Sequence, residues 1–283
     1  MSADSVSLRI DAHHHVWSLA RGDYDWLTPR LAPIYRDFTL DDLRPELRAA
    51  RIDATVLVQA APTVAETEYL LGVARSSGGV VRGVVGWVDL GATNAIATLE
   101  RLARDSLLKS IRPMLHDLPD ADWILRPAVT AALRALPELG LRFDALVRPR
   151  ELSAVLQLLD RMPQLAVVID HGAKPDIAAR AWQPWADLIE TAATHPHVCC
   201  KLSGLATEAE SGWTPDSLRR HVEHLIACFG PRRLLWGSDW PVVNLAGGYR
   251  QWLAATETLL APLTAAERAA ILGENARRFY GLD

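Results

Sequence analysis

The sequence predicts an α/β protein, a single (β/α)8 TIM barrel, and three observations support this prediction. Short apolar or β-branched segments alternate with longer amphipathic segments along the chain, which favours a parallel sheet. Eight such units in 283 residues suit a closed barrel. An open doubly wound sheet is the second choice, but no Gly-x-Gly-x-x-Gly follows an early strand. We therefore expect one barrel domain over residues 1–283.

The expected strands are short and rich in Val, Ile and Leu. They cover residues 8–13, 54–58, 83–88, 108–112, 141–146, 166–170, 198–202 and 234–238. Helical periodicity follows each strand. The expected helices cover residues 40–50, 66–76, 94–105, 123–136, 151–161, 177–194, 215–228 and 249–260, and a ninth helix, 264–279, ends the pattern.

Start signals support several of these helices. Thr39 is followed three residues later by Asp42, and Thr264 by Glu267, the spacing of a capping box. Thr214 precedes a proline, which suits the first helical position.

One connection is longer than the others. Residues 18–38 contain Asp25 and Trp26 and show neither helical nor strand periodicity. A long irregular loop in a compact domain is usually a lid or a binding loop. Because this loop follows the first strand, we expect it to cover the catalytic face of the barrel.

The composition excludes several classes of protein. The chain is 49% hydrophobic and 23% charged, with a formal net charge of -4 and no long basic run, so neither nucleic acid nor a membrane is an expected partner. Residues 1–6 lack the features of a signal peptide, and a cytoplasmic location is expected. Three cysteines make no disulfide framework. A homo-oligomer is compatible with the sequence.

The first strand ends in a histidine run. Side chains alternate along a strand, so Asp11, His13 and His15 are expected on one side and His14 on the other. Two imidazoles that point into the same space are suited to a divalent metal such as zinc.

Polar residues also end or interrupt later strands. Because the carboxyl ends of barrel strands surround one cavity, these residues are candidate functional groups: Arg112, Asp144, His171, Lys201 and Asp239.

Each of them also has a structural alternative. His171 taken alone fits a buried structural histidine, and Arg112 and Lys201 fit strand ends that reach solvent. Asp170 is expected to face outward or cap a turn, since it has the opposite parity to His171, and Asp144 could pair with Arg142. Three further histidines are expected to have structural roles: His14, His195 and His197. The role of His116 is left open.

Together these motifs resemble the amidohydrolase superfamily. The matches are His-x-His at His13 and His15, His171 within Val-Ile-Asp-His-Gly, and Asp239 within Trp-Gly-Ser-Asp-Trp-Pro. Within it, the chain is similar to amidohydrolase family 2 and its sugar lactonases, typified by L-fuconolactonase. Additional matches lie in the loop 18–38, after the second strand and at strands four and seven, so the likeness covers nearly the whole chain.

The resemblance implies a metal site of His13, His15, His171 and Asp239. Binuclear members carry a carboxylated lysine where this chain has Arg112, and the fifth strand has no histidine. At most one divalent ion is therefore expected, with zinc as the expected metal. The reaction could also proceed without a metal. Lactones are activated esters, so a general base and a cationic oxyanion site are enough to open them.

The implied reaction is hydrolytic opening of a small sugar lactone to the free acid, in carbohydrate catabolism. Asp239 would be the general base, assisted by His171, while Arg112 and Lys201 would stabilise the developing oxyanion. Four residues are expected to bind substrate besides Arg112: Asp25, Trp26, Glu66 and Trp240. Two alternatives are a metal-dependent decarboxylase of an aromatic or unsaturated acid and a non-catalytic barrel that binds a sugar acid.

Overall fold

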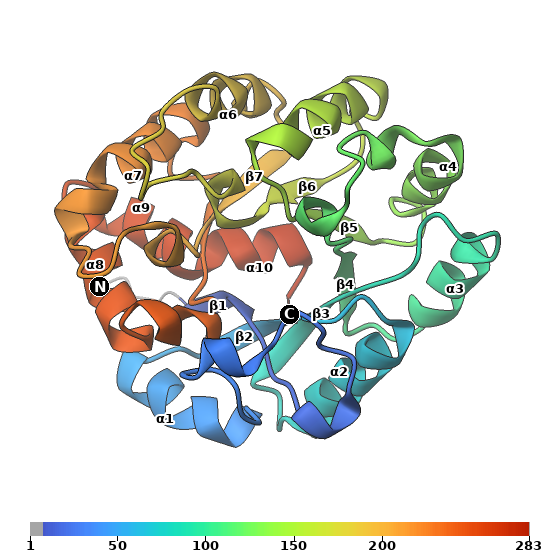
Figure 1. The fold of residues 1–283 in the computed structure, drawn as a ribbon, viewed down its shortest axis with the longest axis horizontal. Coiled ribbons are helices and arrows are strands. Elements are labelled where there is room, and N and C mark those ends of the chain that lie inside the picture. The colour runs from blue at the N-terminus through green and yellow to red at the C-terminus, as the bar shows by residue number, and fades with distance from the viewer. Residues whose placement is uncertain (1–7, 283) are drawn as a thin grey trace, which may run out of the picture.

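The computed structural model describes residues 8–282, and the expectation about residues 1–6 lies outside them. Eight parallel strands pair in consecutive order and are ringed by helices, which confirms the predicted barrel (Figure 1). The strands are β1 (Ile10–His14), β2 (Ala54–Val58), β3 (Val81–Gly86), β4 (Leu108–Ile111), β5 (Arg142–Ala145), β6 (Val167–Ile169), β7 (Val198–Leu202) and β8 (Leu234–Trp236).

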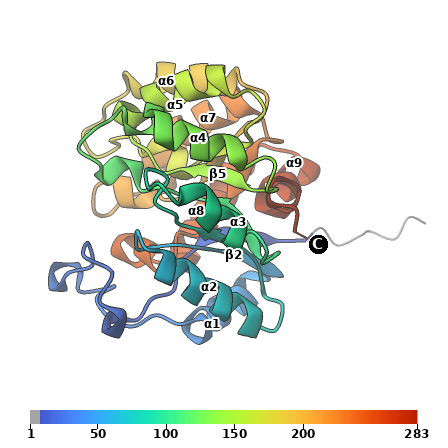
Figure 2. The same cartoon turned by 90° about the vertical axis from the view of Figure 1, so that its right-hand side faces the viewer.

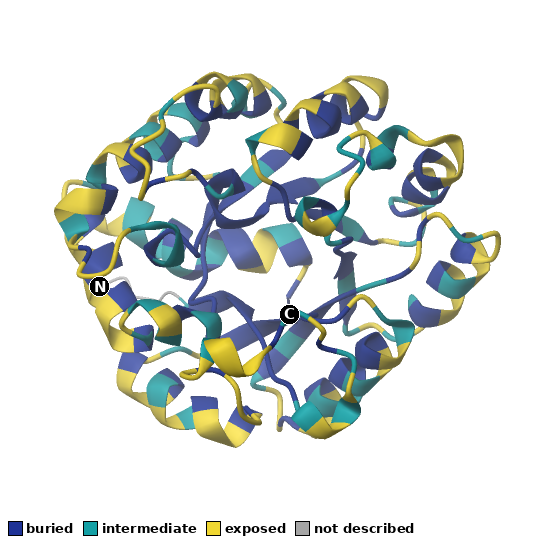
Figure 3. Cartoon of the chain, in the orientation of Figure 1, coloured by how far each residue is buried: buried dark blue, intermediate teal, exposed yellow. Residues whose placement is uncertain are grey.

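The helices are α1 (Leu40–Ala50), α2 (Val64–Ser76), α3 (Ala95–Leu102), α4 (Pro127–Ala135), α5 (Pro149–Arg161), α6 (Trp185–Ala193), α7 (Pro215–Phe229), α8 (Tyr249–Leu259), α9 (Ala265–Ala269) and α10 (Asn275–Tyr280). Helices α1 to α8 surround the strands, with their inner faces buried and their outer faces exposed (Figure 3). Within residues 8–282, no helix combines the length and apolar character needed to cross a membrane.

The first and last strands meet just beyond β8. The Asp239 N–H donates to the His13 carbonyl at 2.8 Å, and the His15 N–H donates to the Trp240 carbonyl at 2.7 Å. These bonds bring the histidine run beside the segment that carries Asp239.

Most strand and helix predictions agree with the structure to within a few residues. The capping boxes at Thr39 and Thr264 are present, and Pro215 occupies the first turn of α7. The predicted helix 177–194 is wrong in its first half, because proline disfavours a helix interior and α6 begins only after Pro184.

Two other predicted helices are divided. Residues 123–136 form a 3-10 turn, Trp123–Leu125, followed by α4, which begins at Pro127. The predicted helix 264–279 is interrupted by a π-helical turn, Ala270–Glu274, between α9 and α10.

The two ends of the barrel are covered differently. Residues 18–38 contain only short 3-10 turns at Leu19–Arg21 and Pro29–Leu31. This segment and α9 lie at opposite ends of the barrel (Figure 2). Helix α10 crosses the centre of the ring in Figure 1, and its Tyr280 packs with Ile10 and Val56 in the buried cluster of the strands.

Candidate active site

The structure brings together two histidines from β1 and the segment after it with Asp239, which follows β8. His13 Nε2 lies 3.3 Å from His15 Nε2 and 3.7 Å from Asp239 Oδ1, and His15 Nε2 lies 3.3 Å from the same oxygen. His171 Nε2 approaches Asp239 Oδ1 at 3.9 Å. All four residues are at most 4% exposed.

Two glycines make room for these imidazoles. A Cβ on Gly237 would lie 2.6 Å from the His13 Cβ, and a Cβ on Gly204 would lie 2.5 Å from His171 Nδ1. Gly204 also has a φ of +63°, which disfavours other residues. The glycines therefore let β8 and the end of β7 approach the histidines closely.

Asp11 does not join the cluster, contrary to the parity prediction. The pairing of β1 with β2 shifts register between Asp11 and His14, so simple alternation fails there. The Asp11 carboxylate accepts hydrogen bonds from the Ser238 N–H at 2.8 Å and the Tyr249 hydroxyl at 3.2 Å. His14 is buried, with Nε2 2.9 Å from Thr55 Oγ1, as expected of a structural histidine.

The cluster suits a divalent cation. His15 Nδ1 lies 2.8 Å from the Val58 carbonyl, which can only accept, so Nε2 presents a lone pair to Asp239 and His13. Burial lowers the pKa of His171 to about 3, which keeps its ring neutral. Ligand atoms of a tetrahedral zinc site lie about 3.3 Å apart, close to the distances of the cluster. His13, His15 and Asp239 thus have the chemistry and spacing of a metal site.

Asp239 is an ionised carboxylate in this setting. Burial opposes its charge, but the surrounding imidazoles of His171, His15 and His13 outweigh burial and hold the pKa of Asp239 below its ordinary value. A carboxylate that stays charged can accept a proton.

A cavity of about 210 Å³ opens beside the cluster. It lies at the carboxyl ends of the strands, where catalytic groups of barrels gather. Five of the residues proposed from the sequence line its wall: His15, Trp26, Arg112, His171 and Asp239.

Comparison with known proteins identifies the family of the chain. A family model described as amidohydrolase matches residues 10–282. The chain belongs to the amidohydrolase family. An L-fucono-1,5-lactonase of Burkholderia ambifaria is 46% identical and covers 98% of this chain, which spans 97% of that protein. An L-fucono-1,5-lactonase of Burkholderia multivorans is 35% identical over the same shares of the two chains.

A solved structure is similar to this amidohydrolase throughout. It is a crystal structure of an amidohydrolase from Burkholderia multivorans with bound zinc, with 33% sequence identity and a TM-score of 0.92, covering 98% of this chain and 100% of that one.

A buried ionic network underlies the metal-type cluster of this amidohydrolase. The Lys201 ammonium lies 2.6 Å from Asp144, 2.9 Å from Asp170 and 3.1 Å from His13 Nδ1. Lys201 is fully buried and does not line the cavity. Lys201 therefore lies beneath His13. A group that binds the oxyanion would be expected on the cavity wall, where Lys201 does not lie.

Two predictions about this network were wrong. Asp170 is fully buried because β6 ends at Ile169 and the chain turns at His171, with a φ of +53°, so strand parity no longer applies. Burial opposes its charge, but Lys201 and His13 hold the pKa of Asp170 well below its ordinary value.

Asp144 pairs with Lys201 and with the Tyr280 hydroxyl at 2.7 Å. It does not pair with Arg142, whose Nε donates to the Phe279 carbonyl at 2.7 Å. Helix α10 supplies Tyr280 as a partner of Asp144 and Phe279 as the partner of Arg142. A rule that pairs residues close in the sequence cannot predict these contacts.

Arg112 reaches from β4 to the cavity wall. Its Nη1 lies 3.3 Å from Asp170 Oδ2, and its Nη2 donates to the Gln59 carbonyl. The guanidinium is 3% exposed, so it combines a held position with access to the cavity.

The expected substrate-binding residues have different positions. Trp26 lines the cavity, whereas Asp25 is exposed and lines a neighbouring cavity with Trp26. Glu66 lies behind the wall, where it accepts the N–H groups of Ala60 and Ala61. Trp240 packs edge-on against the buried ring of Phe38 and does not line the cavity.

Sequence reasoning missed three polar residues of the wall and left the role of a fourth, His116, open. They lie in the loops that follow β4, β5 and β6: His116, Asp117, Arg148 and Lys174. His116 Nε2 pairs with Asp117 Oδ1 at 3.0 Å. Their positions within three to six residues of strand ends were the available signal, although a loop's path cannot be read from periodicity.

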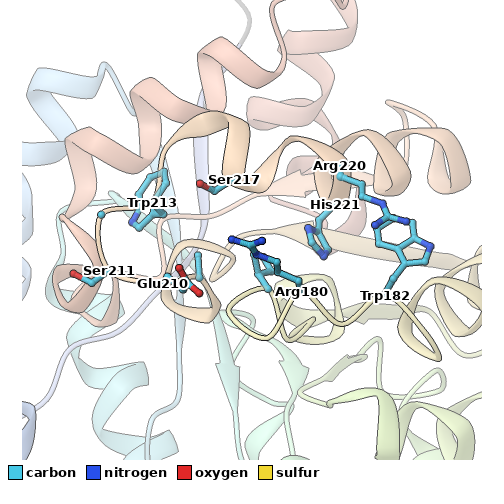
Figure 4. Close-up of a pocket in the computed structure, with 11 residues that line it drawn as sticks. Arg180, Trp182, Glu210, Ser211, Trp213, Ser217, Arg220 and His221 are labelled. Atoms are coloured by element: carbon cyan, nitrogen blue, oxygen red, sulfur yellow. The ribbon is translucent and has the colours of Figure 1, made fainter.

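A cavity larger than the one beside the cluster lies elsewhere. It measures about 410 Å³ and lies between the loops after β6 and β7 (Figure 4). Arg220 stacks over Trp182 at 3.7 Å on one side of it. None of the site residues proposed from the sequence lines this cavity.

Proposed function

We propose that this chain opens a small sugar lactone to the free acid, with Asp239 as general base. The observation that carries the proposal is the ionised, buried Asp239 carboxylate among three imidazoles at the mouth of the cavity. The names of the two Burkholderia relatives support an L-fuconolactone-like aldonolactone as substrate.

The reaction needs one proton acceptor and one oxyanion stabiliser. Asp239 takes a proton from water while the water oxygen bonds to the lactone carbonyl carbon. The bond from that carbon to the ring oxygen then breaks, and Asp239 returns the proton to the ring oxygen. The Arg112 guanidinium at the wall stabilises the negative charge that develops on the carbonyl oxygen.

The donor set suits one metal ion, with zinc as the proposed metal. His13, His15 and Asp239 would hold it, joined by His171. A divalent ion at such a site lowers the pKa of water to about 7 and polarises a carbonyl group. His15 keeps its lone pair available through the bond of its Nδ1 to Val58.

We further propose that residues 18–38 form a lid within a single catalytic domain. The base of the segment is joined by hydrogen bonds between Trp17 and Phe38 at 2.9 and 3.0 Å. Trp26 donates from Nε1 to the Ala60 carbonyl at 2.7 Å and so places its indole on the cavity wall. The ring would exclude water from the bound lactone.

A screen of aldonolactones with a pH indicator tests the function. Ring opening produces an acid that releases one proton per turnover, so we expect acidification with at least one five- or six-membered sugar lactone. Saturable binding without acid would favour the non-catalytic barrel, and carbon dioxide release from an aromatic acid would favour the decarboxylase. Each of these results contradicts the proposal.

The same screen with a chelator tests the metal. Loss of activity after exhaustive chelation, with recovery on adding zinc, supports a required ion. Full activity after chelation would exclude a required metal and leave the lactone reaction in place.

A further inference from the structure

Three potential metal ligands lie together on the outer surface, away from the candidate active site. Helices α6 and α7 are neighbours in the ring (Figure 1). Glu190 extends from α6, and His224 and Cys228 lie on one face of α7, four residues apart. Each offers one ligand atom, and the three atoms all lie within 4.8 Å of one another.

The distances are close to those of a tetrahedral zinc site. With Zn–S of about 2.3 Å and Zn–N of about 2.05 Å, a sulfur and a nitrogen ligand lie about 3.6 Å apart. His224 Nε2 lies 3.6 Å from Cys228 Sγ. It lies 4.0 Å from Glu190 Oε1, and the Glu190 side chain is 63% exposed, so a rotamer change can close the remaining gap.

The surroundings hold the histidine and leave space for an ion. The His224 ring packs against Trp182 and Trp185, with centroids 5.0 and 5.2 Å away. A surface cavity of about 380 Å³ is lined by the three candidate ligands and by small residues only: Ala193, Thr194 and Ala227. No bulky side chain of this lining occupies the place of an ion or of a fourth, water ligand.

We propose that Glu190, His224 and Cys228 bind a divalent cation of the zinc class and thereby join α6 to α7. Thiolate, imidazole and carboxylate are the ligand types that zinc takes in proteins. On binding, the Cys228 thiol releases its proton to solvent. His224 Nε2 gives up its contact with the Ala186 carbonyl, 3.2 Å away, and its ring proton resides on Nδ1.

Cobalt(II) titration of the full chain separates this site from the catalytic one. Thiolate ligation produces a near-ultraviolet charge-transfer absorption, whereas His13, His15, His171 and Asp239 supply only nitrogen and oxygen. We expect this absorption to saturate as cobalt is added, to disappear on adding zinc, and to be absent in Cys228→Ser. Cys199→Ser is the matched control, because Cys199 lies on β7 outside the cluster, and it should keep the signal.

Two glutamates, one on α6 and one on α7, provide a second test. Glu190→Gln should weaken cobalt binding by about 10- to 100-fold or more. Loss of a residue that only supports a metal ligand already lowers metal affinity by that factor. Glu223→Gln changes an exposed glutamate beside His224 on α7 and should leave the affinity unchanged. Zinc should also raise the Tm of the wild type more than that of Cys228→Ser.

The proposal fails if the wild type shows no thiolate charge-transfer absorption or if Cys228→Ser retains it. Should Cys228→Ser fold poorly, His224→Gln gives the same test with the thiol intact, and an undiminished cobalt affinity in that variant would also overturn the proposal. Lactonase activity is not the readout, so the outcome is independent of the proposed function.

Discussion

Asp239 and Lys201 carry opposite charges at two depths of the same site. Asp239 faces the cavity and stays ionised among imidazoles. Lys201 lies beneath His13 and neutralises the fully buried Asp144 and Asp170. Substitutions at the two positions should therefore affect different properties, one the reaction and the other the stability of the fold.

Asp239→Asn should reduce kcat by about 10²- to 10⁴-fold, because the amide cannot take a proton from water. Acid release from an aldonolactone measures the effect. Asp216→Asn, at an exposed carboxylate in the first turn of α7, should retain wild-type kcat. A wild-type rate in Asp239→Asn would refute the role of Asp239 as base.

Lys201→Met should destabilise the fold by about 3–5 kcal/mol, since it leaves the buried Asp144 carboxylate without a cation and Asp170 with Arg112 alone. The free energy of unfolding from urea titration measures the loss. Lys109→Met removes a lysine that donates to the Gly281 carbonyl at the surface and should cost about 1 kcal/mol or less. Equal losses in the two variants would contradict the role of the network.

The residues of the cluster were predictable because each ends a strand. His13, His15, His171 and Asp239 follow apolar segments, and the barrel brings strand ends to one mouth. The depth of Lys201, the orientation of Asp170 and the partner of Asp144 were not predictable, since they depend on a backbone turn after β6 and on contacts with α10.

At the scale of elements, the connection from β2 to α2 depends on one carboxyl group. Glu66, in the first turn of α2, accepts the N–H groups of Ala60 and Ala61 at 3.0 and 2.6 Å. Burial raises the pKa of Glu66 from an ordinary value of 4.5 to about 7. The protonated form is therefore favoured in the folded chain.

Glu66→Gln should flatten the pH dependence of stability between pH 4.5 and 7. The contribution of Glu66 is fully present below pH 4.5 and is lost as the pH rises through about 7. The difference between these pKa values corresponds to about 3 kcal/mol. Urea titrations of both proteins at several pH values measure it.

Glu68→Gln is the matched control, because Glu68 is half exposed and pairs with Arg101 at the surface. Its pH profile should follow that of the wild type. If the wild type and Glu66→Gln lose stability in parallel across this pH range, Glu66 does not titrate as described.

Helices with clear start signals begin where the sequence predicts, and the helices interrupted by Pro184 or by unusual turns were not predicted correctly. Thr39, Thr214 and Thr264 begin helices where expected. The π-helical turn that interrupts the last predicted helix contains Gly273, whose backbone packs closely against Leu8. The helical periodicity of the sequence does not reveal this tertiary contact.

At the scale of the whole molecule, the end of the barrel opposite the cavity is closed by the C-terminal segment. The Tyr280 hydroxyl donates to Asp144, and Asp144 accepts from Lys201, which lies beside His13. Polar contacts thus extend from α10 to the candidate active site. The alternation of strands and helices predicted this barrel, but not which segment closes its far end.

Gly273→Ala should destabilise the whole barrel by about 1–3 kcal/mol. A Cβ at this position would lie 1.7 Å from the Leu8 carbonyl oxygen, so the C-terminal segment would have to move away from the start of β1. Thermal unfolding measures the effect. Gly72→Ala in α2 meets only Arg75 at 3.9 Å and should be neutral or stabilising by about 1 kcal/mol; an equal loss there would contradict the prediction.

The pairing of the first strand with the segment after the last has a consequence for biosynthesis. The bond from the Ser238 side chain to the His13 carbonyl spans 225 positions of the chain. A polypeptide still on the ribosome that has been synthesised only as far as β7 contains His13, His15 and His171 but lacks Asp239. The complete set of reactive groups therefore arises only after Asp239 has been synthesised, and products truncated before it should have little or no lactonase activity.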